Sequence, residues 1–255
     1  MTGIYIVGSA SGFPLPGRGH SSLLISTEGH QILVDAGEPC SRALHGAGYS
    51  LASLDAIFLT HGHADHTGGL PMVIQTAWLS GRTKPLDIFL PEELVKPLGA
   101  WLDATYLGAD FLPFPMRFIA WESQASFAEL GLNIHPCETT HLRSLAKRLG
   151  NHRFKCYSLR FDHPEFSLVV SGDLGEPSDI LPQLTEPVDL LVTELAHFQP
   201  SQLFEVLEGR KIKRVLLTHL APELHGSEGA ILYEAEQHLP DTCILIATDG
   251  FTLEI

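Results

Sequence analysis

Apolar runs in this chain repeatedly end in a polar or charged side chain. Short runs of this kind predict buried β-strands. The polar residues that follow them are Asp35, His61, Asp173, Glu194, His219 and Asp249. In open α/β architectures the functional groups lie at the carboxyl ends of the strands, so we expect the chemistry of this protein to be collected there.

The spacing of apolar residues between these runs predicts helices over 41–48, from Pro71 onward, and over 91–107 with a break near Pro97. It predicts a β-hairpin of residues 23–27 with residues 31–34 and another of residues 156–161 with residues 167–170. It also predicts a hairpin of edge strands over residues 118–134. The run VLLTHL near the end repeats IFLTHG near the start. This repetition indicates a single domain over residues 1–255, built of two βα halves with β layers inside and helices outside.

The densest group of polar residues is IFLTHGHADHTGG, residues 57–69. It contains His61, His63, Asp65 and His66, and its glycines allow a tight turn. Imidazole and carboxylate groups are the ligands that zinc takes in catalytic sites. One HxH pair is weak evidence for a metal, because histidines are common in polar loops. Four such groups within six residues exceed what one tetrahedral ion accepts from so short a loop, so the pattern indicates two ions.

Two further residues fit a metal site. Asp35 directly follows a buried Ile-Leu-Val run, and ligand histidines need an acceptor for their second ring nitrogen, so we expect Asp35 to hold a ligand histidine. His141 follows a short strand, as His61 does. His20, in a glycine-rich loop, either faces the site or is an ordinary turn histidine.

Composition restricts the function. The chain has 255 residues, of which 44% are hydrophobic, and a formal net charge of −14. This charge disfavours a nonspecific grip on nucleic acid or on an anionic membrane. The N-terminus lacks the pattern of a signal peptide, and no apolar run reaches the ~18 residues of a membrane span. We therefore expect a cytoplasmic protein that binds no membrane. Its four cysteines form no CxxC pair, which argues against a zinc knuckle or a disulfide framework.

Basic residues gather after His141, within residues 143–155. They are either a solvated helix face or a local feature that attracts an anionic substrate. The residues are Arg143, Lys147, Arg148, Arg153 and Lys155.

Taken together, these motifs resemble those of the metallo-β-lactamase superfamily. The matching elements are ILVDAG, THGHADH, the single His141, SGD at 171–173 and THL at 218–220, in the order of the family. The chain is most similar to the ribonuclease Z and phosphodiesterase branch, through GLPMVIQTAWLSGRTKPLDIFLPEEL, TELAHF and the terminal ATDGF. The resemblance implies an α/β fold of four layers, the αβ/βα sandwich.

The resemblance also implies a ligand set. One ion would be bound by His61, His63 and His141, a second by Asp65, His66 and His219, and Asp173 would bridge the two. An aspartate rather than a cysteine at position 173 argues against the branch that hydrolyses lactams. We expect two zinc ions, although manganese or iron also fits nitrogen and oxygen ligands.

The implied function is that of a metal-dependent hydrolase, most similar to a phosphodiesterase. A metal-bridging hydroxide would attack a small phosphodiester or nucleotide substrate, and Asp65 would orient this hydroxide. His197 matches the position of a non-ligand histidine in the branch and would protonate the leaving group. Glu194, three residues earlier, would hold His197.

Several alternatives remain open. Ribonuclease Z enzymes that grip transfer RNA often carry a long arm between the single histidine and the bridging aspartate, and the short interval 142–172 argues against that substrate. A lactonase or thioesterase could use the same metals. A metal-bound sensor without turnover is an alternative of another class, and a flavodiiron-like protein would need more carboxylate ligands. A homodimer is compatible with the sequence.

Overall fold

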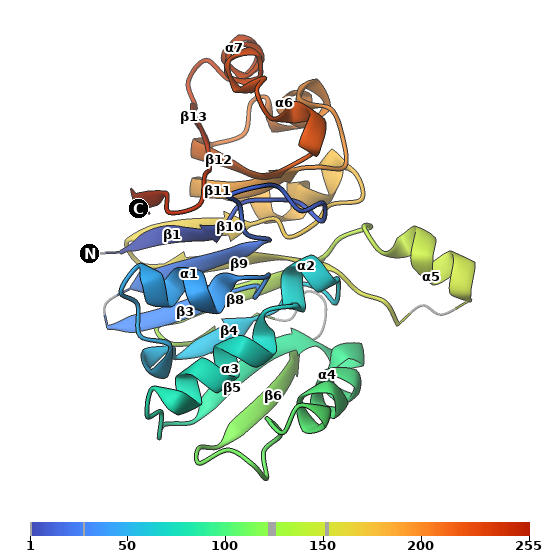
Figure 1. The fold of residues 1–255 in the computed structure, drawn as a ribbon. Coiled ribbons are helices and arrows are strands. Elements are labelled where there is room, and N and C mark those ends of the chain that lie inside the picture. The colour runs from blue at the N-terminus through green and yellow to red at the C-terminus, as the bar shows by residue number, and fades with distance from the viewer. Residues whose placement is uncertain (1, 28, 122–125, 151–152) are drawn as a thin grey trace. The chain divides into compact units, whose positions relative to one another are not determined.

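The computed structural model describes residues 2–27, 29–121, 126–150 and 153–255. The chain forms two compact units (Figure 1). Unit 1 comprises residues 1–122 and 248–254, and unit 2 comprises residues 123–247. Each unit contains a seven-stranded sheet. That the two units act as a single domain stays a prediction.

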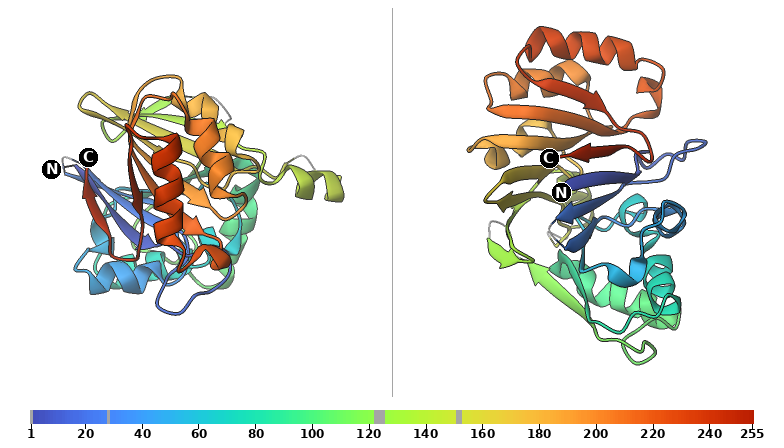
Figure 2. Two further views of the ribbon diagram at one scale, coloured as in Figure 1. Left: turned by 90° about the horizontal axis from the view of Figure 1, so that it is seen from above. Right: turned by 90° about the vertical axis from the view of Figure 1, so that its left-hand side faces the viewer.

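The sheet of unit 1 has the strand order β14-β1-β2-β3-β4-β5-β6. The strands β14, β1, β2 and β3 pair antiparallel, and β3 to β6 pair parallel. Figure 2 shows the terminal strand β14, in red, beside β1, in dark blue. The predicted hairpin of residues 23–27 and 31–34 is confirmed as β2 with β3. The strands are β1 (Gly3–Gly8), β2 (Ser22–Thr27), β3 (His30–Val34), β4 (Ala56–Phe58), β5 (Leu86–Pro91), β6 (Met116–Trp121) and β14 (Thr252–Glu254).

Helices connect the parallel strands of unit 1 and share one apolar core with them. Leu44, Ile74 and Leu102 come from three different helices and are fully buried together with Ile57 and Ile88 of the sheet. This burial is the main stabilising contribution of each helix. The helices are α1 (Cys40–Gly46), α2 (Ala64–Thr67), α3 (Leu70–Leu79) and α4 (Glu92–Ala104), with a 3₁₀ turn, η1 (Leu51–Ser53).

The break predicted near Pro97 is wrong, because α4 continues through this residue. Proline removes one backbone donor from a helix interior. Leu98 and Leu102, on the next turn, are buried in the core of unit 1. Their burial offsets the lost hydrogen bond and keeps the helix intact.

The sheet of unit 2 has the strand order β13-β12-β11-β10-β9-β8-β7. Here β7 to β10 pair antiparallel, and β10 to β13 pair parallel. The predicted hairpin of residues 156–161 and 167–170 is confirmed as β9 with β10. The strands are β7 (Phe127–Glu129), β8 (Leu132–Glu138), β9 (Tyr157–His163), β10 (Phe166–Val170), β11 (Val188–Leu195), β12 (Ile212–Leu220) and β13 (Cys243–Ile246).

Helices also cover the sheet of unit 2. Leu203 and Phe204 of one helix and Ile231 and Ala235 of another are buried with Val215 of the sheet. The helices are α5 (Arg143–Leu149), α6 (Pro200–Leu207) and α7 (Glu228–His238), with 3₁₀ segments η2 (Pro177–Leu184) and η3 (Pro222–Leu224). Among the described residues, no helix is both long and apolar enough to cross a bilayer.

The hairpin predicted over residues 118–134 is wrong in its pairing. The strand β6 pairs with β5 in unit 1, whereas β7 pairs with β8 in unit 2. Both are edge strands, as expected. Residues 122–125 of the predicted hairpin lie outside the described residues.

Strand direction decides where the polar residues lie within each unit. In unit 1 the strands β1, β3 and β4 run in one direction, so residues 9–20, Asp35 and residues 59–69 all follow carboxyl ends at one edge of the sheet. In unit 2 the same holds for β8, β10, β11 and β12. Each unit therefore presents one edge that carries candidate functional residues.

Candidate metal centre

Unit 1 collects three histidines and a carboxylate at the end of β4. The chain leaves the strand at Phe58 and turns into the single helical turn α2, which carries Asp65 and His66. The rings of His61 and His66 lie 4.1 Å apart between centroids, and those of His61 and His63 lie 4.7 Å apart. His61 and His66 are buried. The predicted cluster of residues 61–66 thus lies together in this unit.

Asp35 organises this cluster. Its carboxylate accepts a hydrogen bond from His66 Nδ1 at 2.7 Å and from Thr60 N at 2.8 Å. The Thr60 hydroxyl also donates to the carboxylate, at 2.9 Å from Oδ2. Asp35 has a φ of 57°, in the left-handed region that Asp and Asn adopt more readily than most residues. Asp35 contacts a histidine of this cluster, as expected; that His66 binds a metal ion stays a prediction.

This network fixes the proton positions on two rings. A hydroxyl has one proton, and Thr60 gives its proton to Asp35, so Thr60 Oγ1 accepts from His61 Nδ1 at 3.1 Å. His66 Nδ1 likewise donates to Asp35. In neutral imidazole the other nitrogen then carries the lone pair, so in both histidines Nε2 is the nitrogen that could bind a metal ion.

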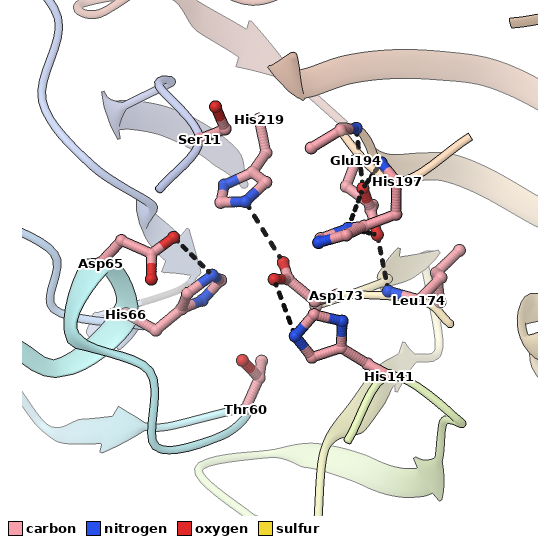
Figure 3. Close-up of polar contacts among 12 residues, drawn as sticks. Ser11, Thr60, Asp65, His66, His141, Asp173, Leu174, Glu194, His197 and His219 are labelled. Atoms are coloured by element: carbon pink, nitrogen blue, oxygen red, sulfur yellow. Dashed lines mark hydrogen bonds and ion pairs between the residues drawn. The ribbon is translucent and has the colours of Figure 1, made fainter. Parts of the chain in front are cut away.

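Unit 2 collects the remaining predicted ligands around Asp173. Its Oδ2 lies 3.5 Å from His141 Nε2, and its Oδ1 lies 3.5 Å from His219 Nε2. Asp173 and His219 are buried, and His219 has a φ of 50°. Figure 3 shows the carboxylate between the two rings. The two oxygens of one carboxylate thus face two different histidines.

Glu194 connects His197 to the backbone beside Asp173 (Figure 3). The Glu194 carboxylate accepts from His197 Nδ1 at 2.7 Å and from the backbone N–H of Leu174 at 2.7 Å. The His197 ring lies 4.6 Å from that of His141 and 6.4 Å from that of His219, measured between centroids. Glu194 is 1% exposed, whereas the side chain of His197 is 35% exposed. The predicted pair therefore exists, and its histidine lies beside both candidate ligand histidines of this unit.

The loops that carry His141 and Asp173 are fixed to each other. Asp179 Oδ2 accepts from Thr140 N and from Gly175 N, both at 2.8 Å. A Cβ atom at Gly175 would lie 2.2 Å from Thr140 Oγ1 and 2.8 Å from His141 N. Only glycine allows this close approach of the two loops.

The donor sets fit divalent metal ions. Nitrogen–oxygen distances of 3.5 Å at Asp173 and of 3.6 Å between His66 Nε2 and Asp65 Oδ2 are long for hydrogen bonds. Two ligands of a tetrahedral zinc ion, each bonded at about 2.0–2.1 Å, are separated by about 3.3–3.4 Å. These pairs therefore have nearly the spacing of ligands that share an ion.

The sequence analysis assigned no role to some residues that position the site. The Thr60 hydroxyl forms hydrogen bonds with both Asp35 and His61. Asp249 accepts hydrogen bonds from Ser9 N at 2.9 Å and from Gly19 N at 2.6 Å. Its position after the last apolar run was the available signal. His20 Nδ1 contacts Ser11 O at 2.8 Å, which fits the interpretation as a loop histidine.

The basic residues of segment 143–155 are mostly exposed. Arg143, Lys147, Arg148 and Arg153 are exposed, and Lys155 pairs with Glu138 at 2.6 Å. This exposure is compatible with a solvated helix face and with an anion-attracting surface. Residues 151 and 152 of the segment lie outside the described residues.

Comparisons with known proteins identify the family. The sequence matches the Beta-lactamase superfamily domain over residues 30–220. It is 33% identical over 238 residues to Ribonuclease Z of Pseudomonas putida (strain W619), with 77% of this chain and 73% of that protein covered. The chain spans about half the length of several other Ribonuclease Z relatives.

Solved structures agree on the fold. The metallo-β-lactamase fold protein YhfI from Bacillus subtilis has a TM-score of 0.81 at 21% identity, with 99% of this chain and 98% of that chain covered. A diphosphatase from the PhnP family has a TM-score of 0.72 at 19% identity, with 100% and 98% covered. The predicted fold class is confirmed, and the chain belongs to the β-lactamase superfamily, a superfamily of hydrolases with the metallo-β-lactamase fold and with Ribonuclease Z among its members.

Proposed function

We propose that this protein is a phosphodiesterase that uses two divalent metal ions on a small phosphodiester or nucleotide. The observation that carries the proposal is the Asp173 carboxylate, whose two oxygens each lie 3.5 Å from a different histidine. A carboxylate in this arrangement is suited to bridge two ions. The Ribonuclease Z relatives support phosphodiester chemistry, because RNA is a phosphodiester.

The proposed ligands form two sets. One ion takes His61, His63 and His141, the other takes Asp65, His66 and His219, and Asp173 serves both. Membership of the superfamily supports this combination. Zinc is the proposed metal, since imidazole and carboxylate ligands suit it, with manganese or iron as alternatives. When bound, such ions activate water near neutral pH and stabilise negative charge on phosphate oxygens.

His197 is the proposed general acid. Its Nδ1 is held by Glu194, so Nε2 is the nitrogen that can exchange a proton. Transfer of the Nε2 proton to the leaving-group oxygen would complete cleavage of the phosphorus–oxygen bond. Glu194 fixes the ring, and Asp65 is proposed to orient the attacking water as well as to bind metal.

The experiment compares His197→Ala with a matched control. His238→Ala also removes a histidine that pairs with a glutamate, because His238 Nδ1 lies 2.6 Å from Glu208 Oε1 in the same unit. Against bis-p-nitrophenyl phosphate, His197→Ala should retain its metal content and lower turnover by about 10²–10⁴-fold, whereas His238→Ala should match the wild type. Unchanged turnover of His197→Ala would remove the proposed role.

A substrate panel of bis-p-nitrophenyl phosphate, cyclic nucleotides and lactones tests the reaction class. Hydrolysis of lactones alone would replace the proposal by the lactonase alternative. Bound metal without turnover of any substrate would favour a sensor.

Transfer RNA is the second candidate substrate, favoured by the Ribonuclease Z relatives. In the described part of the interval between His141 and Asp173, the structure has α5, the β9–β10 hairpin and no further helix or strand. The net charge of −14 opposes RNA binding. Cleavage of a precursor transfer RNA more efficiently than of the small esters would decide for RNA.

A further inference from the structure

The loop of residues 9–20 lies against a candidate metal ligand in unit 1. A Cβ atom at Gly12 would be 3.2 Å from Oδ2 of Asp65 and 3.6 Å from its Cγ. The backbone at Gly12 therefore packs on the carboxylate. Phe13 is the next residue, about 3.8 Å further along the chain measured between Cα atoms.

The base of this loop is fixed at both ends by one carboxylate. Asp249 Oδ1 accepts from Ser9 N and from Ser9 Oγ, and Asp249 Oδ2 accepts from Gly19 N. Ala10 N donates to Gly19 O at 2.8 Å, which closes the loop. The position of Gly12 beside Asp65 is thus built into unit 1.

The side chain of Phe13, which follows Gly12 in this loop, is exposed to solvent. Its side chain is 62% exposed, so most of the ring adds nothing to the core. Pro14 follows it, and a residue before proline is restricted to extended conformations. The backbone at Phe13 is therefore restricted before any ligand arrives, which lowers the entropic cost of a contact.

Exposed apolar side chains are common on protein surfaces and carry no meaning by themselves. Phe111 in the same unit is 48% exposed and supplies the comparison. What sets Phe13 apart is its place next to Gly12, whose backbone lies on the Asp65 carboxylate.

We propose that Phe13 is a specificity-determining residue that stacks on the base of a nucleotide phosphodiester whose phosphate is at the metal site. The proposal rests on the proposed function and names its substrate class. Arg18 lies at the base of the same loop, where its Nη1 donates to Ser9 Oγ at 3.0 Å, so the loop combines an aromatic face with a cation. Both suit a nucleotide better than a simple alkyl phosphate.

The test uses two substrates with the same leaving group. One is the p-nitrophenyl ester of thymidine 5′-phosphate, and the other is ethyl p-nitrophenyl phosphate, which lacks a base. Phe13→Ala should lower kcat/KM for the thymidine ester by about 5- to 150-fold, the loss expected for one stacked base. The same substitution should change kcat/KM for the ethyl ester by less than about twofold. Phe13→Trp should retain the preference, and Phe13→Leu should lose it.

Phe111→Ala is the matched control, and it should leave both substrates at wild-type rates. Binding of thymidine 5′-monophosphate and of inorganic phosphate, measured by equilibrium dialysis, gives a readout that needs no turnover. Phe13→Ala should weaken binding of the nucleotide and leave binding of inorganic phosphate unchanged.

The outcomes separate the two proposals. Equal effects of Phe13→Ala on both esters, or none on either, would overturn the stacking role and leave the phosphodiesterase in place. If the wild type hydrolyses neither ester, the phosphodiesterase proposal fails. In that case weaker nucleotide binding by Phe13→Ala would support the contact, and unchanged binding would overturn it.

Discussion

Replacement of Asp35 by asparagine should move the proton of His66, a proposed metal ligand, from one ring nitrogen to the other. Asparagine keeps the shape of the side chain and tolerates the left-handed backbone at this position. Its single oxygen can accept from Thr60 N and from the Thr60 hydroxyl, as Oδ1 of Asp35 does now. Its NH₂ group then faces His66 Nδ1. Two donors cannot face each other, so His66 must move its proton to Nε2, the nitrogen that would bind metal.

The size of the effect follows from the burial of this group. Asp35 and His66 are 3% and 1% exposed, and a hydrogen bond to a charged group contributes about 1.5–3 kcal/mol. We expect Asp35→Asn to lower the free energy of unfolding of the metal-free protein by this amount. The loss of an acceptor behind a ligand histidine typically lowers metal affinity by about 10–100-fold.

Two measurements check this prediction. Urea unfolding after treatment with a chelator gives the stability, and zinc titration against a chromogenic chelator gives the affinity. Asp87→Asn is the control, because Asp87 also accepts a hydrogen bond from a side chain, that of Arg117, but this side chain is 60% exposed. It should change stability by less than about 1 kcal/mol and leave zinc affinity unchanged. Wild-type zinc affinity in Asp35→Asn would refute the assignment of the His66 proton.

Three further predictions concern packing and ionisation. Gly175→Ala should destabilise the protein by about 1–3 kcal/mol in urea unfolding, because the new Cβ would lie 2.2 Å from Thr140 Oγ1; an unchanged midpoint would show that the loops can separate. Burial acts to raise the pKa of Asp55, but the Lys84 ammonium and a backbone N–H outweigh it and hold this pKa below 3.8. The stability from this pair is thus present above pH 3.8 and lost as the pH falls through the lowered pKa. Lys84→Met should cost about 0.2–1 kcal/mol at pH 7, and a gap to wild type that did not shrink below pH 3.8 would contradict the pairing. Burial raises the pKa of the Cys40 thiol to about 12, so this residue should resist a disulfide reagent at pH 8 until the protein is unfolded, as mass spectrometry can determine.

The sequence predicted the structure best where one rule relates the pattern of apolar residues to the position of a side chain in the fold. Apolar runs that end in polar residues placed Asp35 and His61 at strand ends, and the carboxyl ends of strands that share a direction meet at one edge of a sheet. Asp35 was predicted to hold a ligand histidine because a carboxylate after a buried run needs a partner. The contact with His66 has this form.

Prediction failed where the outcome depends on several partners at once. The relay through Thr60 requires the positions of Asp35 and His61 together, and a threonine before a histidine carries no such signal. The hydrogen bond from Ser9 to Asp249 joins residues 240 positions apart. The pairing of β6 and β7 was wrong because edge-strand patterns do not identify the neighbour.

The strand β14 has a consequence for the order of folding. Residues 248–254 belong to unit 1, yet the ribosome makes them after all of unit 2. Until they emerge, β1 lacks its outer neighbour and the Ser9–Gly19 loop lacks the carboxylate that closes it. A nascent chain can therefore assemble most of its first sheet early, but the loop with Phe13 acquires its final geometry only after residue 249 has been made.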